Sequence, residues 1–170
     1  MIYNRDMSKT THVVHPFRPL FDSDSKILVL GSFPSVKSRE NEFFYGHPRN
    51  RFWAVIAAVY GEAVPETVEE KKDILARHGI ALWDTVFSCD IAGSADSSIR
   101  NIVPTDLRPV IEGSAIERVY CNGTASFRMY QRYHEQALGI KAVRLPSTSP
   151  ANAAWSLEKL TDHWRIITDG

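Results

Sequence analysis

Hydrophobic and polar positions follow two patterns along this chain, and the two patterns alternate. Short, continuous apolar runs form the first pattern. The clearest is Lys26 to Gly31, which is typical of a strand buried on both faces. Three more runs, Ile80 to Val86, Ile116 to Cys121 and Ile140 to Leu145, each follow a glycine or a small-residue turn. We therefore predict four strands.

The second pattern places apolar residues three or four positions apart, as on one face of a helix. It predicts a helix over residues 50–60 and a second over 66–78, whose early acidic and late basic residues suit the helix dipole. Helices are also expected over 107–112, 124–137 and the C-terminal segment. For the C-terminal helix we expect Ser149 as the N-cap and Pro150 as the first helical residue.

Strands that alternate with helices predict an α/β layer fold with a largely parallel sheet. Ligands bind such sheets at the carboxyl ends of the strands. This rule selects four loops as candidate sites, namely residues 31–48, 87–104, 122–123 and 146–152.

Composition narrows the function classes. The chain has 170 residues, 44% of them hydrophobic, which suffices for one domain with a single core. Lysine plus arginine equals aspartate plus glutamate at 20 each, so any electropositive surface must be local. Cys89 and Cys121 fit no paired metal-ligand spacing, and we find neither a secretory segment nor the about 20 apolar residues of a membrane helix. We expect a cytoplasmic protein with two reduced core thiols.

The loop after Gly31 is unusually apolar for a connection, because it contains Phe43, Phe44 and Tyr45. Two interpretations stay open. The loop forms a pocket for a flat heterocycle, with an aromatic ring stacking on it and backbone N–H groups after Gly31 pointing inward, or it packs as a satellite core. Its basic residues, which outnumber the neighbouring Glu40 and Glu42, suit phosphate contact beside base stacking; they are Lys37, Arg39, Arg49 and Arg51.

Two other predicted loops are less decisive. Residues 145–153 are uncharged and contain two prolines, so they either enter a DNA groove or simply begin the last helix. The polar stretch Ser88 to Ile99, which includes Asp90 and Asp96, either lines the pocket or turns the chain. The chain has no glycine-rich dinucleotide or P-loop motif, so we do not expect a nucleotide cofactor.

Three of these stretches, in this order, resemble one family. A buried strand ending in Gly31-Ser-Phe-Pro-Ser35, then Gly46-His-Pro-Arg-Asn-Arg-Phe-Trp53, then Leu145-Pro-Ser-Thr-Ser-Pro150 is similar to the uracil-DNA glycosylase superfamily, and closest to its hypoxanthine-DNA glycosylase branch. The resemblance covers Lys26 to the C-terminus. We therefore expect one glycosylase domain over residues 26–170, preceded by an extension over 1–25.

The resemblance implies a three-layer sandwich, with a four-stranded, mainly parallel sheet flanked by helices. It also implies that the protein uses no metal and no cofactor. The pocket is then expected to accept a nucleotide rotated out of duplex DNA. Tyr45 stands where mismatch-specific relatives stack an aromatic ring on the base. Phe33 stands where they carry the asparagine that positions water, which a phenylalanine cannot do.

Asn50 is the best substitute, because it matches the asparagine regarded as catalytic in the hypoxanthine branch. The alternative for Asn50 is a helix N-cap. We expect His47 to be a hydrogen-bonding loop residue, and Asn122 either to read the base edge or simply to form a turn. The predicted base-binding residues are Gly31, Ser32, Phe33, Pro34, Tyr45, His47 and Asn122. The predicted DNA-binding residues are Lys37, Arg49, Arg51, Ser147, Thr148, Ser149 and Pro150.

The expected activity is hydrolysis of the N-glycosidic bond of a deaminated base, hypoxanthine in deoxyinosine, which starts base-excision repair. No lysine stands in the resembling motifs, which favours a monofunctional enzyme without a Schiff base. Three alternatives are a uracil or G:U-mismatch glycosylase, a DNA-binding module without catalysis, and a small-molecule hydrolase, which lacks the G-x-S-x-G elbow. The expected partner of this monomer is double-stranded DNA, with single-stranded DNA left open.

Overall fold

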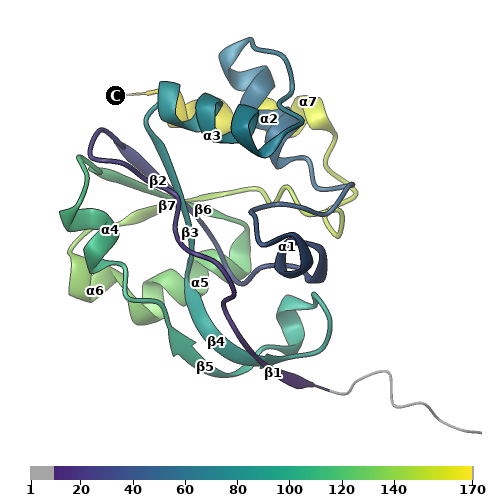
Figure 1. Cartoon of the computed structure of the whole chain (residues 1–170), viewed down its shortest axis with the longest axis vertical. Helices are drawn as coiled ribbons and strands as arrows, with labels where there is room; N and C mark the ends of the chain where they lie inside the picture. The colour runs from purple at the N-terminus through teal and green to yellow at the C-terminus, as the bar shows by residue number, and fades with distance from the viewer. Residues whose placement is uncertain (1–9, 170) are drawn as a thin grey trace, which may run out of the picture.

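The computed structural model describes residues 10–169 and contains a four-stranded parallel sheet (Figure 1). Its strands, in spatial order, are β3 (Ile80–Asp84), β2 (Ile27–Gly31), β6 (Arg118–Asn122) and β7 (Ala142–Leu145). Neighbouring strands are parallel throughout. All five residues of the central strand β2 are buried, as its continuous apolar sequence predicts. The four predicted strands and the mainly parallel sheet are confirmed.

Helices cover both faces of this sheet. They are α1 (Val36–Asn41), α2 (Phe52–Tyr60), α3 (Val68–Arg77), α4 (Arg108–Glu112), α5 (Thr124–Tyr133), α6 (Glu135–Leu138) and α7 (Leu157–Trp164), with short 3₁₀ helices η1 (Asp96–Ser98) and η2 (Arg165–Thr168). Figure 1 shows α2, α3 and α7 on one side of the sheet and α5 and α6 on the other. The three-layer sandwich is therefore confirmed.

The packing of α2 against α7 brings two distant parts of the chain together. The Phe52 and Trp164 rings, both 0% exposed, meet edge to face at 5.9 Å. The indole Nε1 of Trp164 also donates to the backbone carbonyl of Pro146 at 3.0 Å. One buried aromatic pair therefore fixes the helix after residue 51 and the loop after β7 relative to each other.

A second, antiparallel sheet was not predicted. Its strands are β1 (Thr11–Val14), β4 (Val86–Ile91) and β5 (Arg100–Pro104), in the order β1-β4-β5. The prediction of a loop over residues 87–104 is therefore wrong, since β4 and β5 form most of that segment. Only residues 92–99 connect them. The segment was misread because β5 has no buried residue, so no apolar run marks it.

The start of the last helix was also predicted wrongly. It begins at Leu157 with Ser156 as its N-cap, whose hydroxyl accepts from the Lys159 backbone N–H. The expected start at Ser149 and Pro150 fails because the Arg51 guanidinium binds carbonyls in the segment before the helix. Similarly, the loop expected over residues 31–48 contains helix α1, which Ser35 caps.

Residues 10–25 pack onto the rest of the domain. Strand β1 pairs with β4, and Leu20 exchanges backbone hydrogen bonds with Leu82. The segment predicted as an extension thus supplies a strand of the second sheet; its residues 1–9 lie outside the described part.

Burial raises the pKa of the Cys89 thiol to about 11 and that of Cys121 to about 12. In residues 10–169 no helix is long and apolar enough to span a membrane.

Candidate functional site

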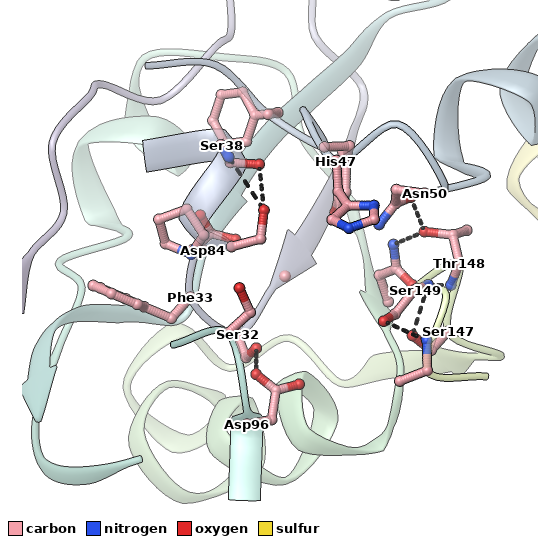
Figure 2. Close-up of a pocket in the computed structure, with 18 of the residues that line it drawn as sticks. Ser32, Phe33, Ser38, His47, Asn50, Asp84, Asp96, Ser147, Thr148 and Ser149 are labelled. Carbon is pink, nitrogen blue, oxygen red and sulfur yellow. Dashed lines mark hydrogen bonds between the residues drawn. The ribbon is translucent and has the colours of Figure 1, made fainter. Parts of the chain in front are cut away.

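A pocket of about 310 Å³ lies at the carboxyl ends of the parallel strands, where the α/β rule places ligands (Figure 2). That volume lies at the small end of the range for ligand sites. Its lining residues are Phe17, Gly31, Ser32, Phe33, Pro34, Ser35, Ser38, Phe44, Tyr45, His47, Asn50, Asp84, Ser94, Asp96, Asn122, Ser147, Thr148, Ser149, Pro150 and Ala151. The structure thus brings together Asn50, all seven predicted base-binding residues and four of the seven predicted DNA-binding residues.

Gly31 and Asp84 form the floor of the pocket. They are neighbours in register at the carboxyl ends of β2 and β3. A Cβ at position 31 would overlap the Asp84 carboxylate oxygen Oδ1, so glycine is required by this close approach. Asp84 is only 5% exposed, and Oδ1 has no hydrogen-bond partner among residues 10–169. The floor therefore offers one hydrogen-bond acceptor to a ligand.

His15 holds the other oxygen of Asp84. Its Nε2 lies 2.6 Å from Asp84 Oδ2, and its side chain is fully buried. The Phe17 backbone N–H donates to His15 Nδ1 at 3.5 Å, which assigns the hydrogen to Nε2. The Nε2–H of His15 thus donates to Asp84 Oδ2 and fixes the orientation of the carboxyl group. The ring packs on Trp83 at 4.3 Å and meets Phe17 edge to face at 4.5 Å.

Tyr45 forms one aromatic wall of the pocket. Its backbone has φ +53°, a left-handed conformation rare for aromatic residues, and its ring stacks on Phe52 at 4.0 Å and 23°. Its hydroxyl is buried and makes no hydrogen bond of normal geometry to residues 10–169. Among the groups around it, the Asn122 side chain favours the deprotonated form of the hydroxyl. Burial, together with the charge of Asp84, raises the pKa of Tyr45. Tyr45 therefore stays protonated at neutral pH.

Asn50 and Asn122 are joined through Thr148. The Thr148 hydroxyl donates to Asn50 Oδ1 at 2.9 Å and accepts from Asn122 Nδ2 at 2.9 Å, as Figure 2 shows for the Asn50 contact. The Thr148 backbone N–H donates to Asn122 Oδ1 at 3.0 Å. Because Thr148 is 0% exposed, its side chain has no surface open to solvent and instead positions the two amides.

The orientation of the Asn50 amide follows from a second donor. The Phe52 backbone N–H also donates to Asn50 Oδ1 at 2.9 Å. A backbone N–H can only donate, so this contact distinguishes the amide oxygen from the nitrogen. Asn50 thus stabilises the turn before α2 through its side-chain oxygen, and it also lines the pocket. Its Oδ1 has both lone pairs engaged, and its Nδ2 has no partner among the described residues.

Arg51 fixes the loop that carries Thr148. Its guanidinium donates to the backbone carbonyls of Trp155, Asn152 and Ser149, and its backbone N–H donates to the Thr148 carbonyl at 3.1 Å. The Arg51 charge is therefore directed into the protein and stays outside the pocket lining. The sequence analysis predicted that Arg51 binds DNA, because nothing in the local sequence indicates that these distant carbonyls are its partners.

The loop between β4 and β5 closes another side of the pocket. The Ser32 hydroxyl donates to Asp96 Oδ1 at 2.6 Å, as drawn in Figure 2. Ser94 Oγ accepts from the Val36 backbone N–H at 2.9 Å, and Arg39 donates to the carbonyls of Pro34 and Gly93. Burial, with the nearby charge of Asp84, raises the pKa of Asp96, while the Ser32 bond opposes this shift. The whole residue nonetheless stays exposed to solvent.

The other predicted residues differ in placement. Phe33 is 8% exposed and lines the pocket, with the Arg39 guanidinium 5.7 Å from its ring centre. His47 Nδ1 accepts from the Arg49 backbone N–H at 3.0 Å, in agreement with a hydrogen-bonding loop residue. Lys37 and Arg49 are exposed and lie outside the lining.

Sequence reasoning missed His15 and Asp84 altogether. Asp84 ends a predicted strand next to Gly31, so the strand-end rule could have identified it. The position of His15 has no comparable signal. His15 is 69 residues from Asp84 in sequence, and the pairing of β1 with β4 brings the two together. Asp96 was noted only as one of several polar residues in its segment.

Chemically, the pocket combines an acceptor on its floor, a protonated tyrosine, a free amide donor and a second carboxylate near the surface. No group of three or more His, Cys, Asp or Glu side chains in residues 10–169 is arranged to hold a metal ion. Aromatic side chains combined with polar groups around one cavity suit a flat heterocycle that carries hydrogen-bonding groups of its own.

Comparisons with known proteins agree with this geometry. Residues 18–169 match the family model of the "Uracil DNA glycosylase superfamily". A "Hypoxanthine DNA glycosylase" of Methanosarcina acetivorans is 30% identical over 152 residues, which cover 89% of this chain and 95% of the relative. A protein of the same name from Methanosarcina barkeri is 33% identical over 86 residues, 50% of this chain and 54% of the relative. The solution NMR structure of a candidate uracil DNA glycosylase from Methanosarcina acetivorans superposes with a TM-score of 0.77 at 28% identity, covering 89% of this chain and 94% of that one.

Proposed function

Since the chain belongs to the uracil DNA glycosylase superfamily, we propose that it is a monofunctional DNA glycosylase acting on deoxyinosine. In this proposal it hydrolyses the N-glycosidic bond of hypoxanthine rotated out of duplex DNA, and it acts as a monomer without a cofactor. The names of the two Methanosarcina relatives support hypoxanthine as the base. The observation that carries the proposal is the Asn50-Thr148-Asn122 network, which joins two of the resembling loops to the end of β6 at one pocket.

Base recognition begins at the floor. Hypoxanthine has a ring N–H next to its carbonyl, whereas adenine has a bare nitrogen at that position. Asp84 Oδ1 would accept this N–H, and it would repel the lone pair of adenine, because His15 holds the carboxylate in place and two acceptors cannot share a hydrogen bond. Tyr45 would stack on the base from the wall that its ring forms with Phe52. Uracil also carries a ring N–H, so the size of the pocket must contribute to the choice between the two bases.

Cleavage develops positive charge on the sugar and negative charge on the departing base. Backbone N–H groups of the turn from Gly31 to Ser35 would stabilise the base, and the Asn50 amide would hold water or sugar at the reacting carbon through Nδ2. Lys37 and Arg49 would contact DNA phosphates, because both are exposed beside the pocket loops. Ser147, Ser149 and Pro150 would lie against the opened base step.

The test is base release from matched duplexes that contain one deoxyinosine or one deoxyuridine. Wild type should release hypoxanthine, and Asn50→Ala should lose turnover while still binding the deoxyinosine duplex. Uracil release alone would move the enzyme to the uracil or mismatch class, and no release from either duplex would leave only a DNA-binding module.

A further inference from the structure

We propose that Asp96 is a catalytic residue whose carboxylate accepts the proton of the attacking water. This inference rests on the proposed glycosylase function and names a group that the resembling motifs do not contain. It assigns the activation of water to a residue of the loop between β4 and β5, instead of to a residue of the turn after β2 or to Asn50.

The argument begins with the need for an acceptor. A water attacking the sugar carbon must give up a proton, and the group that takes it needs a free lone pair. Asn50 Oδ1 is engaged by the Thr148 hydroxyl and the Phe52 backbone N–H. In neutral His47 the Nδ1 lone pair is engaged by the Arg49 N–H, so the hydrogen lies on Nε2. Tyr45 is protonated, which leaves the two carboxylates, Asp84 and Asp96, as proton acceptors among the pocket residues.

Depth separates the two carboxylates. Asp84 is 5% exposed and lies over Gly31 at the floor, where the base ring enters. Asp96 is exposed to solvent, so it lies near the entrance. The sugar remains attached to the DNA backbone and stays nearer the entrance than the base does. Asp84 therefore faces the base, and Asp96 lies at the level of the reacting carbon.

The protein holds Asp96 in this place with several contacts. Its Oδ1 accepts from the Ser32 hydroxyl at 2.6 Å, and Oδ2 has no hydrogen-bond partner among residues 10–169. Ser94 and Arg39 bind the same loop to the segment after Gly31. Ser32 is thus a positioning residue, and one carboxylate oxygen is left for water. Because burial raises the pKa of Asp96, the group is also a stronger base than an ordinary aspartate.

The step balances with water as the only co-reactant. The water oxygen forms a bond to the sugar C1′, and the bond from C1′ to the base nitrogen breaks with its electron pair going to the base. Asp96 Oδ2 takes the water proton and releases it to solvent, while the base takes up a proton from solvent. The products are the free base and an abasic sugar. The negative charge of Asp96 also stabilises the positive charge that develops on the sugar.

Asp96→Asn tests the proposal, because asparagine keeps an oxygen for the Ser32 hydroxyl and loses only the charge. The matched control is Asp90→Asn, which removes a carboxylate from the same pair of strands outside the pocket lining. We expect Asp96→Asn to slow single-turnover release of hypoxanthine about 10²- to 10⁴-fold. Asp90→Asn should stay within about threefold of wild type, and both variants should bind the lesion duplex.

Two further readouts exclude a merely structural role. The wild-type rate should rise with pH and level off above the raised pKa of Asp96, and this rise should disappear in Asp96→Asn. Since a carboxyl whose pKa is raised by folding destabilises the native state at neutral pH, Asp96→Asn should not lower the unfolding temperature at pH 7. Near wild-type rates in Asp96→Asn, or an unchanged pH profile, would overturn the inference. Absence of base release by wild type would overturn the glycosylase function itself.

Discussion

Thr148→Val isolates the network that joins the two asparagines. Valine keeps the shape of this fully buried side chain but removes the hydroxyl, which makes 2.9 Å hydrogen bonds to Asn50 Oδ1 and Asn122 Nδ2. Each such bond contributes about 0.5 to 1.5 kcal/mol net, so the loss of both should cost about 1 to 3 kcal/mol of unfolding free energy. For a chain of this size, each kcal/mol lowers the unfolding temperature by roughly 2 to 4 °C.

Thr148→Ser is the control, since it keeps the hydroxyl and removes one buried methyl group, at a cost of about 1 kcal/mol. Both variants should therefore be destabilised in urea denaturation, Thr148→Val by at least as much as Thr148→Ser. Base release should differ, because only valine removes the hydroxyl that donates to Asn50 Oδ1 and leaves the Phe52 backbone N–H as its one remaining donor. We expect single-turnover release at least tenfold slower in Thr148→Val than in Thr148→Ser. Equal rates in the two variants would refute the positioning role of Thr148.

Three further changes test other parts of the structure. Gly31→Ala should abolish base release and lower stability, because the added Cβ overlaps Asp84 Oδ1; activity assays and urea denaturation check this. Arg51→Ala should lower the unfolding temperature and slow base release more than Arg51→Lys does, because lysine can still reach one of the three carbonyls; differential scanning calorimetry separates them. Burial lowers the pKa of His134, whose Nε2 lies 2.9 Å from the Thr85 carbonyl, so the folded state resists protonation. Stability should then fall as pH drops below about 6.5, and His134→Gln should reduce that loss between pH 7.5 and 5.5.

Elements with local signals could be predicted from the sequence. The apolar run from Lys26 to Gly31 became the central strand β2, and the spacing of Phe52, Ile56 and Tyr60 became α2. The strand-end rule selected the loops that carry Tyr45 and Asn122, which both line the pocket, whereas Asn50 was named from the family resemblance. These features depend on periodicity and on parallel topology, both of which a sequence displays directly.

Features that depend on distant pairing could not be predicted. Strand β5 has no buried residue, so only its antiparallel contact with β4 defines it. The role of Arg51 depends on carbonyls about 100 positions away, and its charge alone suggested DNA. Asp84 has a partner, His15, that a short N-terminal strand delivers. In each case tertiary contacts, which local sequence does not encode, decided the outcome.

The central claim is that this pocket excises hypoxanthine from DNA. Its most direct test is single-turnover incubation of the purified protein with a duplex carrying one deoxyinosine, followed by mass spectrometric detection of the free base. The account predicts one equivalent of hypoxanthine, an abasic site without strand cleavage, and loss of both products in Asn50→Ala. Release of no base, or equal release by Asn50→Ala, would contradict it.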